Sequence, residues 1–328
     1  MKFLIVGLGS IGKRHLDNIR IIDPDAEITI WHTRSRRGTG QAGVAREVFC
    51  NEEAISLKPD IAIIANPASA HIPIAQKLSQ EGIDLFIEKP LSSTIEGINE
   101  LLQIQKTTGN LIMVGYNLRF HPALKMLKQC ITEGKIGKLV SIRAEVGQYL
   151  PDWRPGTDYR LSVSAQKELG GGAVLELSHE IDYTRWLAGE ITSVMSMTDH
   201  VSDLDIDVED SAEIIMSFSS GALGSIHLDM IQRTPARFCK VIGTLGTAIW
   251  DGASDSVMIF TTETNQWNQT NPVGKTDRNS LYLSEMEHFI SCCRNRNEPA
   301  VTVSDGKRVL EIALAALESS RDKRCIAV

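Results

Sequence analysis

The chain has 328 residues, of which 42% are hydrophobic, and a formal net charge of −7 at pH 7. This length suggests two domains, although a single large α/β unit stays possible, and the hydrophobic content excludes a mainly disordered protein. The acidic balance argues against a nucleic-acid binder, and no apolar run approaches the roughly 20 residues of a membrane span. The apolar run after Met1 is too short for the core of a signal peptide, so we expect a cytoplasmic protein.

The six cysteines are scattered and form no Cys-x-x-Cys pair. No Cys/His spacing suits zinc, and the sequence contains no His-Glu-x-x-His motif. We therefore expect reduced thiols and no metal site.

The first 120 residues alternate short apolar runs with helical patterns. The apolar runs predict strands at 3–6, 28–31, 61–65, 84–87 and 111–114, and helical stretches between them include 13–22, 72–80 and 94–107. Strands that alternate with helices at this spacing are typical of βαβ units and a parallel sheet. We assign residues 1–121 to this α/β domain.

The pattern changes after residue 122. A helix-like segment at 123–133 is followed by strands at 139–146, 192–197, 212–218, 223–230, 238–242 and 247–250, and helices at 281–293 and 304–320 close the chain. Polar alternation along these strands predicts a large, mostly antiparallel sheet with one open face. Residues 151–169 read as a long loop, which in a compact domain is usually functional or disordered. Residues 122–328 thus form a predicted second domain of the α+β class.

The first strand leads directly into Gly7-Leu8-Gly9-Ser10-Ile11-Gly12, a Gly-x-Gly-x-x-Gly motif that precedes a predicted helix. This context is the one that a dinucleotide fingerprint requires. Gly7 permits the tight turn, Gly9 lets the backbone approach a pyrophosphate, and Gly12 lets the helix pack on the strand. The helix N-terminus, with Ser10 and Ile11, would hold the pyrophosphate, so a Rossmann domain is expected.

The end of the second strand carries no acidic residue for ribose hydroxyls. The chain has Trp31-His32-Thr33-Arg34-Ser35-Arg36-Arg37 at this place. We expect Thr33, Arg34, Ser35 and Arg36 to bind the ribose and its 2′-phosphate, which favours NADP and leaves NAD possible. The alternative is a solvated basic loop.

Several further motifs follow in a fixed order. They are Asn66-Pro67 with His71, Glu88-Lys89-Pro90 at a strand end, Gly115-Tyr116-Asn117-Leu118-Arg119-Phe120-His121-Pro122, and Gly170-Gly171-Gly172 leading to His179-Glu180-Ile181-Asp182. With the fingerprint, this series resembles the glucose–fructose oxidoreductase/inositol dehydrogenase/MocA (Gfo/Idh/MocA) oxidoreductases. The resemblance implies a Rossmann domain and an α/β domain whose open antiparallel sheet often forms an oligomer interface. It also implies that the last helix returns toward the first domain.

The resemblance implies roles for individual residues. Lys89 would lie beside the nicotinamide and polarise the substrate oxygen, and His179 would remove or return the hydroxyl proton. Asp182, on the same helical face, could orient the imidazole or bind substrate. The cofactor side of the site would include Asn66, Pro67, His71 and Glu88, together with Lys89.

One position departs from the family pattern. Many members carry an Asp four residues before the histidine, whereas this chain has Leu175 there and Glu176 three residues before His179. Glu176 could serve with its longer side chain, or the acid could be dispensable. Further candidate substrate residues are Asn117, Arg119, Trp153, Tyr159 and Arg160, because they combine aromatic faces with groups that hydrogen-bond hydroxyls or acidic groups.

These observations predict an NADP-dependent oxidoreductase that acts on a sugar, nucleotide sugar or cyclitol. Lys89 and His179 would carry the chemistry, in a homodimer or homotetramer that assembles through the second-domain sheet. Two alternatives stay open: a non-catalytic dinucleotide sensor, and an enzyme that recycles a tightly bound NADP.

Overall fold

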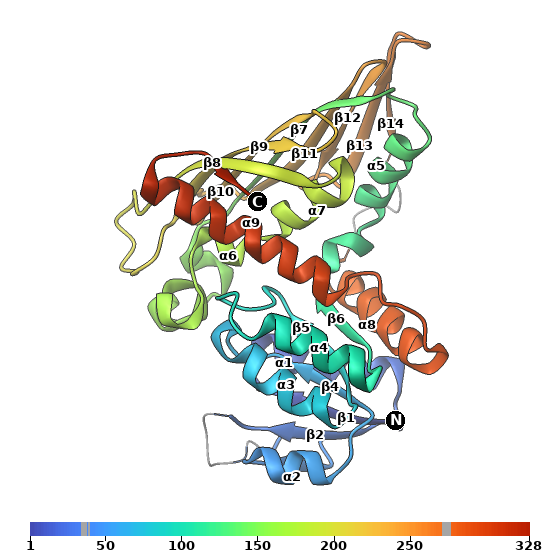
Figure 1. Cartoon of the computed structure of the whole chain (residues 1–328), viewed down its shortest axis with the longest axis vertical. Helices are drawn as coiled ribbons and strands as arrows, with labels where there is room; N and C mark the ends of the chain where they lie inside the picture. Colours follow the sequence, from blue (N-terminus) through green and yellow to red (C-terminus); the bar gives the residue numbers. More distant parts are fainter. Residues whose placement is uncertain (34–37, 39, 271–276) are drawn as a thin grey trace. The chain divides into compact units, whose positions relative to one another are not determined.

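The computed structural model describes residues 1–33, 38, 40–270 and 277–328. They form two compact units (Figure 1): one comprises Met1–Asn117 with Arg278–Lys307, and the other comprises Leu118–Asp277 with Arg308–Val328. The predicted boundary after residue 121 lies close to the point where the chain leaves the first unit. The segment Arg278–Lys307 nevertheless belongs with the first unit, so the units do not follow a single break in the chain.

The first unit is built on a six-stranded sheet in the order β3-β2-β1-β4-β5-β6, and all its neighbouring strands are parallel. This order is that of a doubly wound dinucleotide-binding fold. The strands are β1 (Lys2–Val6), β2 (Glu27–Trp31), β3 (Arg46–Val48), β4 (Ile61–Ile64), β5 (Asp84–Glu88) and β6 (Ile112–Gly115). The sequence missed β3, whose three residues are too few to show a periodic pattern.

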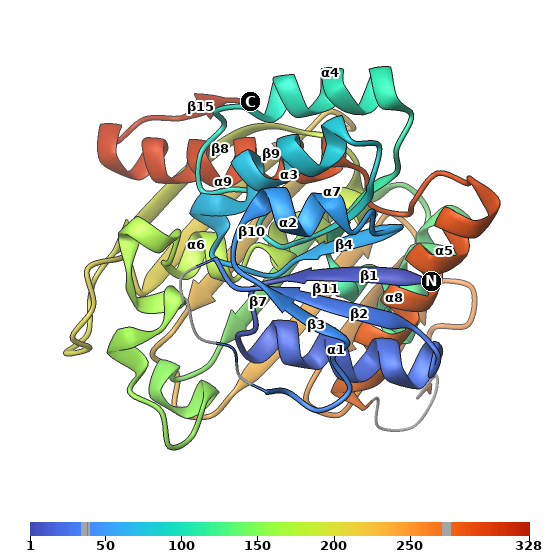
Figure 2. The same ribbon diagram turned by 90° about the horizontal axis from the view of Figure 1, so that it is seen from below.

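Helices cover both faces of this sheet (Figure 2). Helices α3 and α4 pack together on one face, and α1 packs with α8 on the other. The unit's helices are α1 (Ser10–Ile22), α2 (Asn51–Ser56), η1 (Ala68–Ala70), α3 (His71–Gln80), α4 (Ile98–Thr108) and α8 (Arg278–Asn295), with the start of α9 (Val303–Asp322). Because both faces are covered, β4 and β5 are buried at every residue, which explains their unbroken apolar runs.

The second unit is built on a nine-stranded sheet in the order β14-β13-β12-β11-β7-β10-β9-β8-β15. Neighbouring strands are antiparallel except for the parallel pair β7 and β10. The strands are β7 (Leu139–Gly147), β8 (Ile191–Asp199), β9 (Ser211–Phe218), β10 (Leu223–Asp229), β11 (Ala236–Gly243), β12 (Gly246–Asp251), β13 (Ser256–Thr261), β14 (Gln266–Thr270) and β15 (Ile326–Ala327). The predicted fold class is thereby confirmed for both units.

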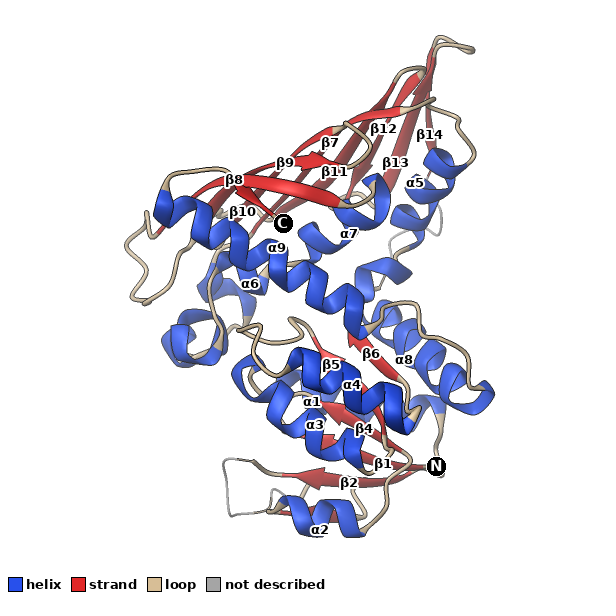
Figure 3. Ribbon diagram, in the orientation of Figure 1, coloured by secondary structure: helices blue, strands red, loops and turns tan. Residues whose placement is uncertain are grey.

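Helices of the second unit lie on one face of this sheet (Figure 3). They are α5 (Pro122–Thr132), α6 (Ala173–Glu176), α7 (His179–Ala188) and the remainder of α9. In the described part of the chain no helix covers the opposite face, where Met195, Met197, Ile215 and Leu223 are exposed. Assembly through this face stays a prediction.

The predicted long loop before α6 is made of successive short turns. It contains the 3₁₀ segments η3 (Leu150–Trp153), η4 (Tyr159–Leu161), η5 (Val163–Ala165) and η6 (Lys167–Leu169). Another 3₁₀ segment, η2 (Asn117–Phe120), precedes α5. Such segments have no extended apolar periodicity, so a sequence pattern reads them as loop.

Two further features concern the cysteines and the apolar character of the helices. All six cysteines are free thiols, and Cys50 and Cys325 are exposed. Among the described residues, no helix has the length and apolar character required to cross a membrane.

His227 lies on the open face of the sheet between two carboxylates. Its Nδ1 is 2.7 Å from Glu213 Oε1, and its Nε2 is 3.0 Å from Asp229 Oδ2. The hydrogen bond with Asp229 and the nearby Glu213 raise the pKa of His227 to about 9. Burial opposes ionisation of Asp229, but the imidazole and two backbone N–H groups outweigh it and lower the pKa of that carboxyl.

We predict that His227→Gln destabilises the chain at pH 6 by about 1 kcal/mol, a value discounted for the partial exposure of the imidazole. Because the folded-state pKa is raised, this stabilisation is complete below about pH 6.5 and is lost as the pH rises through about 9. Urea unfolding of both proteins at pH 6 and pH 10 measures the difference. An equal difference at the two pH values would contradict the role of the charged imidazole.

Candidate active site

The dinucleotide fingerprint forms the turn between β1 and α1. Gly7 has a φ of +91°, and a Cβ there would lie 3.1 Å from the backbone nitrogen of Asn66. At Gly12 a Cβ would overlap the carbonyl oxygen of Gly7, so the helix packs against the turn too closely for any side chain. At Gly9, by contrast, no described atom beyond its two chain neighbours lies within 4 Å of the Cβ position.

The N-terminus of α1 is open to an anion. Gly9 occupies the N-cap position and offers no capping side chain, and the first turn contains no acidic residue. The backbone N–H groups from Ser10 onward therefore keep their capacity to bind a negative ligand, which the helix dipole favours. The turn, the open space at Gly9 and this helix end fit the pyrophosphate of a dinucleotide.

Asn66 follows β4 at the same edge of the sheet. Its backbone packs against Gly7, and its side-chain amide is buried, with no hydrogen-bond partner for Oδ1 or Nδ2 among the described residues. A buried amide without partners is costly, so its position beside the fingerprint fits a polar group of a bound ligand. Pro67 comes next and precedes η1.

His71 begins α3 and is buried. Its Nε2 lies 2.7 Å from the carbonyl oxygen of Asn66, and its Nδ1 lies 3.1 Å from that of Pro90. Burial lowers the pKa of His71, so its ring is neutral and donates to one of these carbonyls. His71 thus joins the segment after β4 to the segment after β5, and a contact with cofactor stays a prediction.

Glu88 ends β5 and connects two parts of the first unit. Its Oε1 is 2.5 Å from Nε2 of His15 on α1, and its Oε2 accepts the backbone N–H of Lys89 at 3.3 Å. Both His15 and Glu88 are buried, whereas Lys89 is half-buried. Sequence reasoning missed His15, although its place three residues after Gly12 on the inner face of α1 could have indicated a partner.

The expected ribose-binding segment is described only at Thr33, which is exposed. Arg34, Ser35 and Arg36 lie outside the described residues. An acidic residue of the neighbouring strand β3, Glu47, contacts His32 Nε2 at 2.8 Å and accepts the N–H of Gly40 at 2.8 Å.

In the second unit, the three glycines before α6 are required by the backbone. Gly170 and Gly172 have φ values of +86° and +105°. A Cβ at Gly171 would overlap the carbonyl oxygen of Val163, and one at Gly172 would overlap the carboxylate of Glu209. The turn can therefore be made only without side chains.

Glu176 ends the short helix α6 that follows this turn. Its Oε2 accepts the hydroxyl of Ser164 at 3.0 Å. The side chain is partly exposed, and its role with substrate stays a prediction.

His179 is the first residue of α7 and is half-buried. Asp182, one turn further, is buried and pairs with Arg119: the Arg119 Nη2–Asp182 Oδ1 distance is 2.6 Å, and the Arg119 Nε–Asp182 Oδ2 distance is 2.9 Å. The structure thus brings together two residues that the sequence had indicated for separate roles. Asn117, at the start of η2, is buried.

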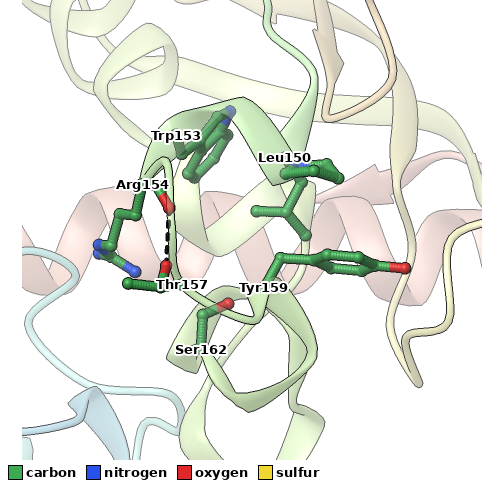
Figure 4. A pocket seen from close by; sticks show the side chains of 7 residues that line it. Leu150, Trp153, Arg154, Thr157, Tyr159 and Ser162 are labelled. Atoms are coloured by element: carbon green, nitrogen blue, oxygen red, sulfur yellow. Dashed lines mark hydrogen bonds between the residues drawn. The ribbon is translucent and has the colours of Figure 1, made fainter.

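Three predicted substrate residues of the loop before α6 form hydrogen bonds with nearby groups of the second unit. Trp153 Nε1 donates to the carbonyl of Gln148 at 2.9 Å, and the Tyr159 hydroxyl accepts the N–H of Asp205 at 3.1 Å. The Arg160 guanidinium pairs with Asp158, at 2.8 Å between Nη2 and Oδ2. Trp153 and Tyr159 also line a small cavity (Figure 4) with a volume of about 10 Å³, room for about one water molecule. A contact of these three residues with substrate stays a prediction.

The described part of the chain contains no set of metal ligands. No group of three or more His, Cys, Asp and Glu side chains there is arranged to hold an ion.

The fingerprint geometry predicts that one alanine substitution mainly affects dinucleotide affinity and another mainly affects folding stability. Gly9→Ala should cost no more than about 1 kcal/mol of folding free energy, through the poorer N-cap, and should weaken dinucleotide binding about tenfold, because its methyl group would fill the open space. Gly12→Ala should cost about 2 kcal/mol of folding free energy, because its methyl group would overlap the Gly7 carbonyl. Thermal unfolding measures the stability of both variants, and fluorescence titration with NADH and NADPH measures their dinucleotide affinity. Unchanged affinity in Gly9→Ala would contradict the proposed pyrophosphate site at this turn.

Comparison with known proteins gives relatives that align along nearly the whole chain. Myo-inositol 2-dehydrogenase of Thermotoga maritima is 27% identical over 99% of this chain and 98% of its own length. Scyllo-inositol 2-dehydrogenase (NAD(+)) of Bacillus subtilis is 29% identical over 97% and 93%. Among solved structures, a levoglucosan dehydrogenase in complex with NADH has a TM-score of 0.89 at 22% identity, over 100% of this chain and 99% of that one, and so has the same fold.

Two family models match consecutive parts of the chain. Residues 1–116 match the NAD-binding Rossmann fold of the Gfo/Idh/MocA oxidoreductase family, and residues 128–328 match its C-terminal alpha/beta domain. The chain therefore belongs to the Gfo/Idh/MocA family of oxidoreductases.

Proposed function

We propose that this protein is a nicotinamide-dependent dehydrogenase that interconverts a hydroxyl and a carbonyl on a sugar, nucleotide sugar or cyclitol. The observation that carries the proposal is the meeting of three motifs at one sheet edge. Strands β1, β4 and β5 are parallel neighbours, and Gly7, Asn66 and Lys89 follow their carboxyl ends. Ligands of open α/β sheets bind at this edge.

The substrate class is inferred from the relatives and from the residues available. The two inositol dehydrogenases align along nearly the whole chain, and both are named for ring polyols. A polyol offers hydroxyl groups to Lys89 and His179, and lysine and histidine are among the side chains that perform general acid–base chemistry on a hydroxyl.

In the proposed reaction, Lys89 and His179 have the separate roles that their family motifs imply. During oxidation His179 takes the hydroxyl proton, while the Lys89 ammonium stabilises the developing alkoxide. When bound, the dinucleotide supplies the acceptor for the hydride, which leaves the carbon that bears the reacting hydroxyl. The Lys89 backbone N–H donates to Glu88, which His15 holds from α1, so the lysine follows a restrained strand end.

We expect Lys89→Met to lower turnover by at least a thousandfold, because it removes the ammonium and keeps the side-chain length. His179→Asn should lower turnover by at least a hundredfold, because the amide cannot accept the proton. Absorbance at 340 nm with a panel of cyclitols, sugars, sugar acids and nucleotide sugars measures turnover. Dinucleotide titration should show unchanged affinity in His179→Asn.

Lys106→Met, at an exposed lysine in the last turn of α4, is the matched control and should keep full activity. Near-normal turnover in Lys89→Met, or no oxidation or reduction of any substrate in the panel, would refute the proposed function.

For the cofactor we propose a preference for NADP over NAD. The support is the series Thr33-Arg34-Ser35-Arg36, which has cations and hydroxyls and no acid, together with the engagement of Glu47 by His32 and Gly40. An acid that binds ribose hydroxyls would repel a 2′-phosphate, whereas guanidinium groups bind it through charge-assisted hydrogen bonds. The NAD(+)-dependent relative from Bacillus subtilis makes this preference a sharp question for this chain.

The double variant Arg34→Ser/Arg36→Ser should bind NADPH at least tenfold more weakly and NADH about as well as before, since each charged hydrogen bond is worth about 1.5–3 kcal/mol. Arg46→Ser, at an exposed cation of β3, is the matched control. Fluorescence titration of both nucleotides gives the affinities. A clear preference of the unmodified protein for NADH would overturn this part of the proposal.

A further inference from the structure

The first turn of α7 carries two buried carboxylates beside His179. Glu180 and Asp182 are both 0% exposed. An isolated buried carboxylate is strongly destabilising, so each requires a cation or several hydrogen-bond donors. The structure provides an arginine for each, from two different elements.

Arg237 of β11 holds Glu180, and Arg119 of η2 holds Asp182. The Arg237 Nε–Glu180 Oε1 distance is 2.7 Å and the Nη2–Oε2 distance is 3.1 Å. In the other pair, Arg119 Nη2 and Nε contact the two Asp182 oxygens at 2.6 and 2.9 Å. Both pairs are bidentate, which fixes the direction of a carboxylate as well as its distance. We call these two ion pairs the Arg237 clamp and the Arg119 clamp.

The two clamped positions lie on different sides of the helix. At about 100° per residue, Glu180 and Asp182 are separated by about 160° around the helix axis. His179 falls within that arc, about 100° from Glu180 and about 60° from Asp182. Two contacts on different sides restrict both rotation and translation of the first turn, and hence the Cα–Cβ direction of His179.

Neighbouring groups hold the Arg119 clamp in turn. The Arg119 guanidinium lies 6.0 Å from the ring centre of Trp186, also on α7. Lys128 of α5 donates to the Trp186 carbonyl oxygen at 2.6 Å. Partial burial and, to a smaller extent, the nearby Arg119 cation lower the pKa of Lys128.

Stability alone does not explain this arrangement. Buried ion pairs are often matched or exceeded in stability by well-packed apolar side chains of similar volume. A bidentate ion pair does, however, impose a defined geometry, because only one alignment of the guanidinium and the carboxylate forms both hydrogen bonds. Two such pairs within four residues of one helix start therefore indicate a requirement for position.

We infer that Arg119 and Arg237 are positioning residues that set the orientation of the His179 imidazole through Asp182 and Glu180. This inference rests on the proposed function, in which His179 moves the substrate proton. Arg119, which the sequence indicated as a substrate ligand, acts here through Asp182.

The test uses the full chain and replaces each arginine with lysine. Lys keeps the positive charge but offers one point of contact in place of two. Arg119→Lys and Arg237→Lys should shift the Cε1–H NMR resonance of His179, assigned by its loss in His179→Asn. Turnover should fall tenfold to a hundredfold while dinucleotide affinity stays unchanged.

The matched control lies on the same helix. Arg185 makes an equally two-pronged pair with Glu190, at 3.1 Å (Nε–Oε2) and 2.5 Å (Nη2–Oε1), but in the last turn of α7. Arg185→Lys should leave both the His179 resonance and turnover within twofold of the unmodified protein. An unchanged His179 resonance in both clamp variants, or an equal shift in Arg185→Lys, would overturn the inference.

Rescue separates positioning from loss of folding. In Arg119→Lys/Asp182→Glu the longer carboxylate compensates for the shorter cation, so the His179 resonance and turnover should return toward their original values. If Arg237→Lys does not fold, Glu180→Gln, which removes the charge and keeps the volume, replaces it with the same expected shift. No rescue, with the double variant folded, would count against the inference.

The NMR readout also keeps the two proposals distinct. Full turnover in His179→Asn would refute the proposed role of the histidine, whereas the resonance in the arginine variants reports its orientation without any substrate. A shift in the clamp variants together with full turnover in them would overturn the functional part of the inference.

Discussion

The candidate site of the first unit depends on the burial of a parallel sheet on both faces. Continuous apolar runs in β1, β4 and β5 leave each strand one arrangement that removes its side chains from water. Their carboxyl ends then lie at one edge, where Gly7, Asn66 and Lys89 follow. The chemistry proposed for this unit would therefore be a consequence of packing, because Gly7, Asn66 and Lys89 occupy the positions at which buried strands emerge.

A single buried contact, His15–Glu88, links the two roles proposed for that edge. His15 belongs to the helix whose N-terminus would bind the pyrophosphate, and Glu88 precedes Lys89. The pair is enclosed by the rings of Phe86 and Tyr282, with centroid distances of 5.1 and 6.3 Å from the His15 ring. A shift of α1 would move Glu88, so dinucleotide binding and the setting of the lysine share one restraint.

Much of this was readable in the sequence, and the parts that were not have a common cause. The fingerprint, the parallel strands and the sheet of the second unit follow from local patterns, which periodicity and glycine spacing report. Short elements such as β3 carry too few residues for a pattern, and β14 is exposed throughout and has no apolar alternation. The Arg119–Asp182 pair joins positions 63 residues apart, so only the packed chain could identify it.

Three buried carboxylates lie beside the candidate catalytic residues, and each has a partner that balances its charge or hydrogen-bonds it. Glu88, Glu180 and Asp182 each lie within three residues of Lys89 or His179. Each is buried, and its partner is the imidazole of His15 for Glu88 and an arginine guanidinium for Glu180 and Asp182. Their partners come from elements distant in sequence, so each pair forms only when the fold is complete. An apolar core could stabilise these positions equally well but would not define a direction. The acidic groups next to the proposed acid–base residues are thus best understood as the means by which the fold determines the geometry of its chemistry.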